Sequence, residues 1–249
     1  MKGNERFIPA ALKFAAFTVV ISLLALAASV TVNGSCDPLL ALVASSDEVN
    51  TPKITVIIDA GHGGFDGGAT AESTDGTVLE KDVNLSIAKR LYFLFQAAGI
   101  ECVMTRTEDV MLGEGKAYDL KNRLELTKKY ENPVFISVHQ NKFPDGNCRG
   151  LQVYYSKNNG DSETLALFIQ NVGRAYLDPD NERNVKKADS SIYLLDRLTC
   201  PAVLVECGFM SNAEELGLIT SADYQKKLAS AIFAAAVEFC GQISESGIK

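Results

Sequence analysis

Residues 54–64 read Ile-Thr-Val-Ile-Ile-Asp-Ala-Gly-His-Gly-Gly, and this stretch decides the fold. The run from Ile54 to Asp59 is continuous, rich in β-branched residues and followed by glycine, which is typical of a strand buried on both faces. Such strands occur in parallel sheets that are covered by helices on both sides. His62 stands directly beyond the run, so the polar chemistry of this segment begins where the strand ends.

Strand and helix patterns alternate from this stretch to the end of the chain. We expect further strands at 100–105, 134–139, 151–155 and 202–207, and helices at 83–98, 119–130, 162–176 and 222–242. The alternation predicts a single α/β domain with an open, mostly parallel sheet and helices on both faces. In such sheets ligands bind at the carboxyl ends of the strands, so we expect the active site there.

The composition limits the classes of function. The chain has 249 residues, of which 47% are hydrophobic, and this is enough for one well-filled core. Its formal net charge is −7, and Lys and Arg form no run longer than a pair. Nucleic-acid binding needs clustered positive charge, so nucleic acid is not an expected partner.

The first 34 residues have a separate character. Three basic residues precede an uncharged apolar stretch from Phe14 to Val32. If the chain is cut near Ala25-Leu26-Ala27, this is a signal peptide, and if it is not cut, the stretch is long enough to be a membrane anchor. Either alternative predicts export of the rest of the protein. We expect a linker at 35–52 and the catalytic domain at 53–243.

Six cysteines in an exported chain raise the question of disulfides. Cys102 and Cys207 fall inside apolar strand patterns, where free cysteine behaves as a small hydrophobic residue. The pairing to test first is Cys148 with Cys200.

The candidate chemistry lies at strand ends. The chain has two histidines, His62 and His139, and each stands at the end of a buried-strand pattern. A third strand, 202–205, runs directly into Glu206. If these strands are parallel, all three side chains emerge at one edge of the sheet, and imidazoles with carboxylates are the ligands that zinc prefers. A lone histidine is more often structural, but two at matching strand ends favour a metal site.

Two neighbouring patterns have rival interpretations. Thr77-Val78-Leu79-Glu80 matches a helix capping box, and the pattern alone favours a capping role for Glu80. The glycine-rich loop 61–68 invites a phosphate-binding interpretation, but Asp66 occupies the third glycine position of a dinucleotide fingerprint, and no Gly-Lys-Ser/Thr follows. We interpret the glycines as letting substrate approach a crowded metal site.

Five motifs together resemble the zinc-dependent N-acetylmuramoyl-L-alanine amidase family, in the family's order and over residues 54–243. They are Asp59-Ala60-Gly61-His62-Gly63-Gly64, Glu80 at the start of a helix, Thr105-Arg106, Ser137-Val138-His139-Gln140-Asn141, and the stretch 201–212 around Glu206.

The resemblance implies one Zn²⁺ held by His62, Glu80 and His139, with Glu206 as the catalytic carboxylate, and it overturns the capping interpretation of Glu80. Gln140 and Asn141 match positions that line the family's substrate groove, although an Asx turn accounts equally well for Asn141. Arg106 and Arg123 also fit the family pattern, and for both we favour a structural ion pair.

The implied reaction is hydrolysis of the amide bond between N-acetylmuramic acid and L-alanine in peptidoglycan. The stretch 187–195 leading into Pro201, without a wall-binding module, is most similar to the germination-specific CwlD-type amidases, which act in forming muramic δ-lactam in the spore cortex. The expected partners are the glycan strand with its stem peptide and, as a further hypothesis, an accessory activator protein. The expected location is the cell wall or spore envelope, with membrane anchoring through the N-terminus as an alternative.

Two other functions are weighed against this one. A cell-wall cysteine peptidase would use Cys207 or Cys148 as nucleophile and His139 as base, but Cys207 follows Glu206 directly and should point to the opposite face of its strand. A non-catalytic wall-binding protein would have lost some of the four site residues, and all are present. The expected elements fill the interval from His139 to Glu206, so we expect no inserted helix that plugs the site.

Overall fold

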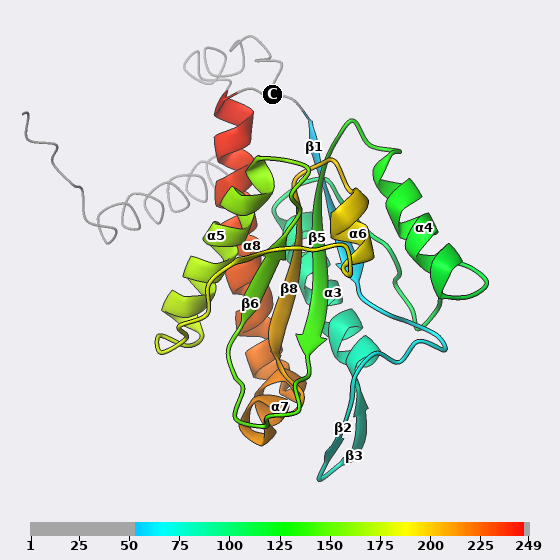
Figure 1. The fold of residues 1–249 in the computed structure, drawn as a ribbon. Coiled ribbons are helices and arrows are strands. Elements are labelled where there is room, and N and C mark those ends of the chain that lie inside the picture. The colour runs from blue at the N-terminus through cyan, green and yellow to red at the C-terminus, as the bar shows by residue number, and fades with distance from the viewer. Residues whose placement is uncertain (1–52, 247–249) are drawn as a thin grey trace, which may run out of the picture. The chain divides into compact units, whose positions relative to one another are not determined.

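The computed structural model describes residues 53–246, so the expected signal segment 1–34 and linker 35–52 lie outside the described residues. The centre of the fold is a six-stranded sheet in the order β4-β1-β5-β8-β6-β7 (Figure 1). The strands are β1 (Ile54–Ala60), β4 (Cys102–Met104), β5 (Asn132–Asn141), β6 (Gln152–Tyr155), β7 (Lys186–Lys187) and β8 (Ala202–Phe209). β4, β1, β5 and β8 are mutually parallel, while β6 runs antiparallel to β8. The predicted α/β class with a mostly parallel sheet is confirmed.

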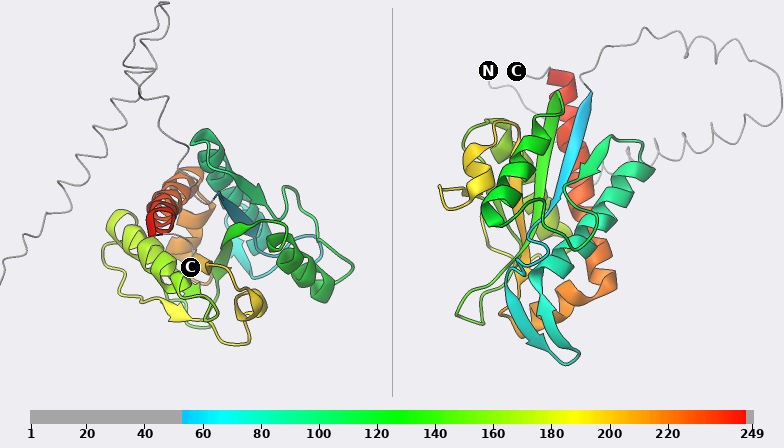
Figure 2. Two further views of the ribbon diagram at one scale, coloured as in Figure 1. Left: turned by 90° about the horizontal axis from the view of Figure 1, so that it is seen from above. Right: turned by 90° about the vertical axis from the view of Figure 1, so that its right-hand side faces the viewer.

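Helices cover both faces of the sheet, as predicted (Figure 2). On one face lie α3 (Glu80–Ala97), α5 (Asp161–Tyr176) and α8 (Ala222–Ser246), and on the other lie α4 (Lys116–Thr127) and α6 (Tyr193–Arg197). A short helix, α7 (Ala213–Thr220), follows β8, and a two-stranded hairpin of β2 (Thr70–Ser73) and β3 (Gly76–Leu79) precedes α3. Five short elements, β2, β3, β7, α6 and α7, were not predicted from the sequence.

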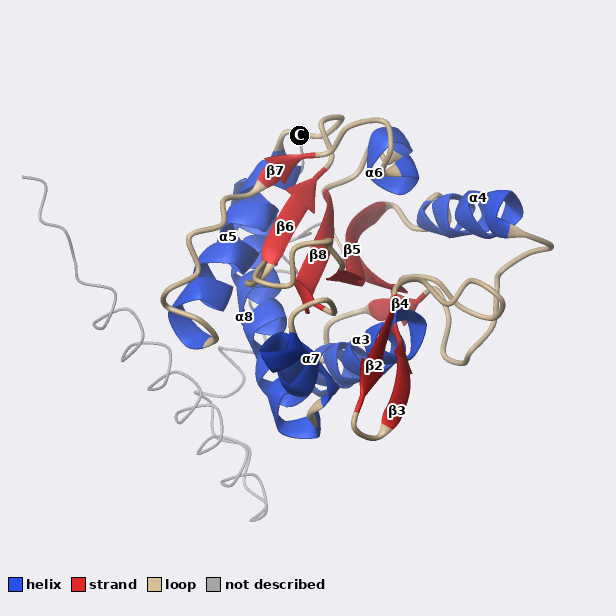
Figure 3. Ribbon diagram, turned by 60° about the horizontal axis from the view of Figure 1, so that its bottom comes forward, coloured by secondary structure: helices blue, strands red, loops and turns tan. Residues whose placement is uncertain are grey.

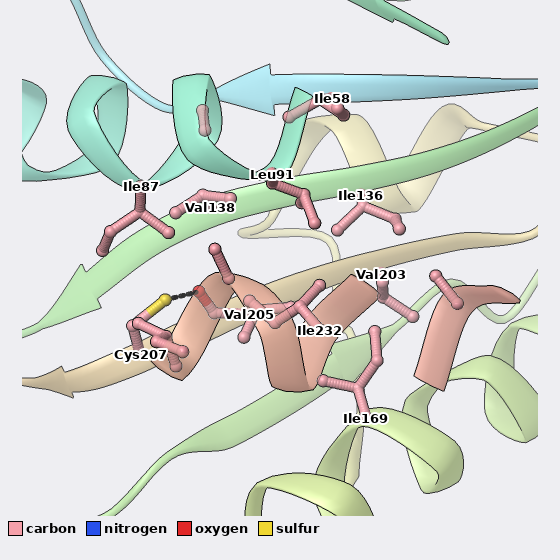
Figure 4. Close-up of a cluster of buried hydrophobic side chains, with 14 of the residues drawn as sticks. Ile58, Ile87, Leu91, Ile136, Val138, Ile169, Val203, Val205, Cys207 and Ile232 are labelled. Carbon is pink, nitrogen blue, oxygen red and sulfur yellow. Dashed lines mark hydrogen bonds between the residues drawn. The ribbon is translucent and has the colours of Figure 1, made fainter. Parts of the chain in front are cut away.

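The alternation of side chains along the buried strands builds two cores. Val56 and Ile58 of β1 face the core under α3 and α8, and Ile57 faces the smaller core under α4 and α6. Figure 4 shows the larger core, in which Val203, Val205 and Cys207 of β8 point toward Ile232 of α8. Because β8 continues this alternation, Cys207 is fully buried on the face opposite Glu206.

The suggested Cys148–Cys200 pairing is wrong, because both cysteines are free. Cys148 lies in the loop after β5, at the carboxyl ends of the parallel strands. Cys200 lies just before β8, at the opposite end of the sheet. A strand of eight residues separates the two ends by about 25 Å at the usual rise, which is far beyond the reach of a disulfide.

A buried ion-pair network fixes the carboxyl end of β1. Arg123 of α4 lies 2.7 Å from Asp119 and 2.5 Å from Asp59, and it donates a hydrogen bond to the backbone oxygen of His62. Burial opposes the charge on Asp59, but Arg123 and the hydroxyl of Ser137 outweigh it and lower the pKa of this carboxyl. The structural ion pair expected for Arg123 is confirmed.

The same expectation for Arg106 is wrong. Its guanidinium is buried and donates instead to four backbone carbonyls, those of Ala60, Gly61, Lys81 and Glu108. Arg106 therefore joins the glycine-rich loop to the start of α3 through the backbone.

Arg123→Ala should lower the free energy of unfolding by about 3–5 kcal/mol, because it leaves Asp59 and Asp119 buried without their cation. Urea unfolding measures this. Lys128→Ala removes an exposed partner of Glu125 at the end of the same helix and serves as the control, with an expected loss below about 1 kcal/mol. Equal losses in the two variants would contradict the role assigned to Arg123.

Candidate metal centre

The carboxyl ends of β1, β5 and β8 meet at one edge of the sheet, which Figure 3 turns toward the viewer. His62 lies two residues beyond β1, and His139 and Glu206 are register partners on β5 and β8. Glu80 is the first residue of α3 and reaches the same edge. The structure therefore brings together the four residues that the sequence singled out from distant parts of the chain.

Three of these residues form a compact group of donor atoms. One ligand atom from each of His62, Glu80 and His139 lies within 4.8 Å of the other two. Glu80 Oε1 is 2.9 Å from His139 Nδ1 and 3.3 Å from His62 Nε2, and the two imidazole rings are 4.9 Å apart in an edge-to-face arrangement. Two imidazoles and a carboxylate suit a transition-metal ion.

The Glu80 carboxylate is held from behind by the backbone. Its Oε2 accepts a hydrogen bond from the Ala69 amide at 2.8 Å, and its Oε1 accepts one from the Gln140 amide at 3.1 Å. Burial opposes its ionisation, but the hydrogen bonds to His139 and His62 outweigh this and hold the pKa of Glu80 far below its usual range. The group is therefore an anion facing two imidazoles.

The capping-box interpretation of Glu80 is wrong. The N-cap of α3 is Leu79, and no side chain caps this end of the helix. Thr77 lies in β3 and donates its hydroxyl hydrogen bond to Glu72 across the hairpin. The sequence pattern is present, but strand pairing holds Thr77 in an extended strand away from the helix amides.

The glycine-rich loop packs against the cluster itself. His62 has a φ of 61°, a left-handed conformation that costs energy in a residue with a Cβ atom. A Cβ atom at Gly61 would collide with the His139 ring, and one at Gly68 would lie 2.5 Å from Glu80 Oε2. We expected these glycines to let substrate approach, but the space at both positions is filled by candidate ligands.

Asp66, which the sequence analysis did not assign to the site, contacts the outer nitrogen of His62. Its Oδ2 is 3.0 Å from His62 Nδ1, and its Oδ1 accepts a hydrogen bond from the Gly68 amide. A carboxylate on one ring nitrogen fixes the tautomer and leaves the other nitrogen, here Nε2, as the electron-pair donor. The sequence signal for this contact is a carboxylate four residues after a histidine within a glycine-rich loop.

Comparison with known proteins identifies the family. The N-acetylmuramoyl-L-alanine amidase family matches residues 56–238 of this chain. The chain belongs to this amidase family. It is therefore a peptidoglycan amidase, and the predicted family and enzyme class are confirmed.

The relatives of this amidase agree in sequence and in fold. It is 37% identical over 186 residues to the germination-specific N-acetylmuramoyl-L-alanine amidase of Bacillus subtilis strain 168, covering 72% of this chain and 76% of that protein. The CwlD amidase of Clostridioides difficile, solved in complex with the GerS lipoprotein, shares 36% identity and a TM-score of 0.70 over 76% of this chain and 98% of that one. AmiC2 of Nostoc punctiforme shares 30% identity and a TM-score of 0.66, covering 77% and 99%.

Cell-wall amidases act outside the cytoplasm, and this applies to the present amidase. Within residues 53–246, no helix combines the length and the apolar character needed to cross a membrane.

Glu206 differs from Glu80 in its surroundings. Its Oε2 is buried without a hydrogen-bond partner among the described residues. Burial raises the pKa of the Glu206 carboxyl to about 7, an effect that His139 opposes and Glu80 reinforces. The amidase thus places a carboxyl group that can take or give a proton near neutral pH beside the three-residue cluster.

Gln140 and Asn141, the two residues predicted to contact substrate, differ in their surroundings. Gln140 is buried behind the cluster, where its side chain donates to Asn84 of α3. Asn141 is half-buried at the end of β5, and its carbonyl accepts a hydrogen bond from the Met210 amide. Substrate contact by either side chain stays a prediction.

A cavity of about 220 Å³ opens beside His62 and His139. It is bounded by Lys116 and Leu120 of α4 and by residues 191–195 at the start of α6. Leu194 and Leu195 of α6 are buried against the smaller core, so this short helix is part of the fold. In the described interval between β5 and β8 the helices are α5 and α6, and both contribute to the cores.

The cysteine-peptidase alternative loses its main candidate. Cys207 is fully buried, and burial raises the pKa of its thiol above the ordinary range. A buried thiol on the far side of β8 cannot serve as a nucleophile in the cleft.

Glu206→Gln should change how the stability of the metal-free amidase depends on pH. The folded-state pKa of about 7 lies above the ordinary value of 4.5, so the folded protein binds more protons than the unfolded chain between these values. The free energy of unfolding of the wild type therefore falls as the pH rises through this window. The variant lacks this group, so its stability relative to wild type should be higher at pH 7 than at pH 5. Urea unfolding in the presence of a chelator measures the stability of wild type and variant at each pH. The same stability difference between the two proteins at pH 5 and at pH 7 would contradict the raised pKa.

Proposed function

We propose that this amidase is a zinc enzyme that cleaves the amide bond between N-acetylmuramic acid and L-alanine, and that it does so in the spore cortex. The observation that carries the proposal is the His62–Glu80–His139 cluster with the unpartnered Glu206 beside it. Three protein donors with an additional carboxyl group are the arrangement found in hydrolytic zinc sites, whereas structural zinc sites use four protein ligands.

His62, Glu80 and His139 would hold the ion. Zinc suits this set because it accepts imidazole and carboxylate donors together, and no cysteine belongs to the group. When bound, zinc supplies positive charge that acidifies water and polarises the amide carbonyl. Asp66 orients His62, and the backbone amides of Ala69 and Gln140 orient Glu80, so these two donors are fixed before any ion arrives.

Glu206 would move the proton. With a pKa near 7, its carboxylate takes a proton from the water that attacks the carbonyl carbon. The protonated carboxyl then gives that proton to the nitrogen of L-alanine as the C–N bond breaks, and the carboxylate is restored. One residue can do both because its proton affinity lies close to the working pH.

The spore role rests on the relatives. The Bacillus subtilis relative is named as germination-specific, and the Clostridioides difficile structure is a complex of the CwlD amidase with a lipoprotein. For the present amidase we infer cortex modification that yields muramic δ-lactam, export directed by residues 1–34, and an accessory protein as a partner. The catalytic domain would then be residues 53–243.

His62→Ala, Glu80→Ala and His139→Ala should each lower the zinc content of the purified protein, because each removes one of three donors. Elemental analysis after dialysis measures this. Glu206→Gln is the matched control: it should keep zinc at the wild-type level and lose hydrolysis of purified peptidoglycan, since only the proton acceptor is removed. Full zinc content in Glu80→Ala would contradict the ligand set, and near wild-type turnover in Glu206→Gln would contradict its role.

Spores of a strain that lacks this protein should contain cortex without muramic δ-lactam, because the lactam can form only after the stem peptide has been removed. Chromatography of digested cortex measures the lactam. Restoration by the wild-type chain and not by the Glu206→Gln chain is the expected control result. A normal lactam content in the deletion strain would contradict the spore role and leave the amidase activity intact.

A further inference from the structure

The stem peptide that leaves in this reaction must start next to Glu206. This step rests on the proposed function, in which Glu206 gives its proton to the nitrogen of L-alanine. A proton donor has to lie within hydrogen-bond reach of that nitrogen, so the stem peptide extends from Glu206 across the neighbouring surface. His139 and the metal cluster lie on one side of Glu206, and β6 and β7 lie on the other.

The strand register places specific side chains along that route. Glu206 pairs with Gln152 of β6, and in the adjacent row Leu204 pairs with Tyr154, which pairs with Lys186 of β7. Paired residues project to the same face of a sheet. Lys186 is exposed, and its ammonium lies 5.8 Å from the centre of the Tyr154 ring. Lys186 therefore lies on the same face as Glu206.

Arg183 is a second cation, and it lies beside the Glu206–Gln152 pair. Arg183 donates to Gln152 Oε1 at 3.2 Å, and its guanidinium lies 4.4 Å from the centre of the Phe209 ring. A further hydrogen bond to the Arg149 carbonyl fixes its orientation. Neither Arg183 nor Lys186 forms an ion pair with another of the described residues. Two acidic residues flank them on this segment: the exposed Glu182, and Asp189, whose carboxylate accepts hydrogen bonds from the amide and hydroxyl of Ser191.

The spacing suits an acidic peptide. Neighbouring strands lie about 4.8 Å apart, so β7 lies roughly 10 Å from β8, and an extended peptide advances about 3.3 Å per residue. The stem peptide of peptidoglycan carries a free α-carboxylate on its second residue, directly after L-alanine, and a carboxylate there falls between Glu206 and β7. We propose that Lys186 and Arg183 form an anion subsite that binds the stem-peptide carboxylate next to the scissile amide.

The chain supplies a matched control for this subsite. Lys187 follows Lys186 in β7 and is also exposed, but it pairs with Tyr155 and projects to the opposite face. Lys186→Ala and Lys187→Ala therefore remove the same charge from neighbouring positions, and only the first removes it from the face of Glu206.

The test uses zinc-loaded Glu206→Gln protein, which binds substrate without consuming it. The probes are two glycan fragments that bear L-alanyl-D-glutamate stems with the side-chain carboxyl capped, one with the α-carboxyl free and one with it as a carboxamide. Calorimetry gives the Kd of each. The free acid should bind about 10-fold more tightly than the amide, the size of effect expected for one charge-assisted contact.

Adding Lys186→Ala should remove most of this preference, and adding Lys187→Ala should leave it unchanged. Arg183→Lys, which keeps the charge, should retain part of it. In the otherwise wild-type enzyme, Lys186→Ala should raise KM for the free acid and leave kcat and the zinc content unchanged. Equal Kd values for the two fragments, or equal effects of the two lysine variants, would overturn the subsite. A failure of the proposed function would appear separately, as wild-type enzyme that binds the fragments and hydrolyses neither.

Discussion

The carboxylate of Glu80 is only 5% exposed, and the neighbouring structure is arranged to keep its charge in place. An isolated buried carboxylate costs several kcal/mol and would ordinarily take up a proton. Here two backbone amides and two imidazoles surround it, and they come from the glycine-rich loop, from Ala69 directly after this loop and from β5. The glycines at 61 and 68 are required because the imidazole of His139 and the carboxylate itself occupy the space that their side chains would need.

The alternation of side chains along a strand separates the site residues from the hydrophobic core. Along β8 the residues alternate, so Glu206 faces the His62–Glu80–His139 cluster while Cys207 and Val205 lie in the hydrophobic core. The two carboxyl groups of the site also differ by environment: Glu80 is held as an anion by donors, whereas Glu206 Oε2 has no hydrogen-bond partner in residues 53–246 and burial raises the pKa of this carboxyl. This difference supports the proposal that Glu80 holds a cation and Glu206 moves a proton.

The strand ends of the site could be predicted because β1, β5 and β8 are long apolar runs, and parallel strands present their carboxyl ends at one edge. The short elements could not: β2 and β3 are four-residue strands with little apolar periodicity, and α6 has five residues. For α7 the signal was present, since Asn212 accepts hydrogen bonds from the amides of Glu214 and Glu215 as an N-cap. The pattern at Thr77 to Glu80 misled the local analysis, because strand pairing, which is not local, decides the position of Thr77. The contact of Asp66 with His62 depends on a loop conformation that spacing alone does not specify.

X-ray absorption at the zinc edge of the zinc-loaded protein tests the central claim most directly, because it reports the atoms that surround the ion. The account predicts a first shell of nitrogen and oxygen at about 2.0–2.2 Å, with the multiple-scattering signature of two imidazoles that drops to one in His62→Ala. A sulfur shell near about 2.3 Å, or a signature of two imidazoles that persists in His62→Ala, would contradict it.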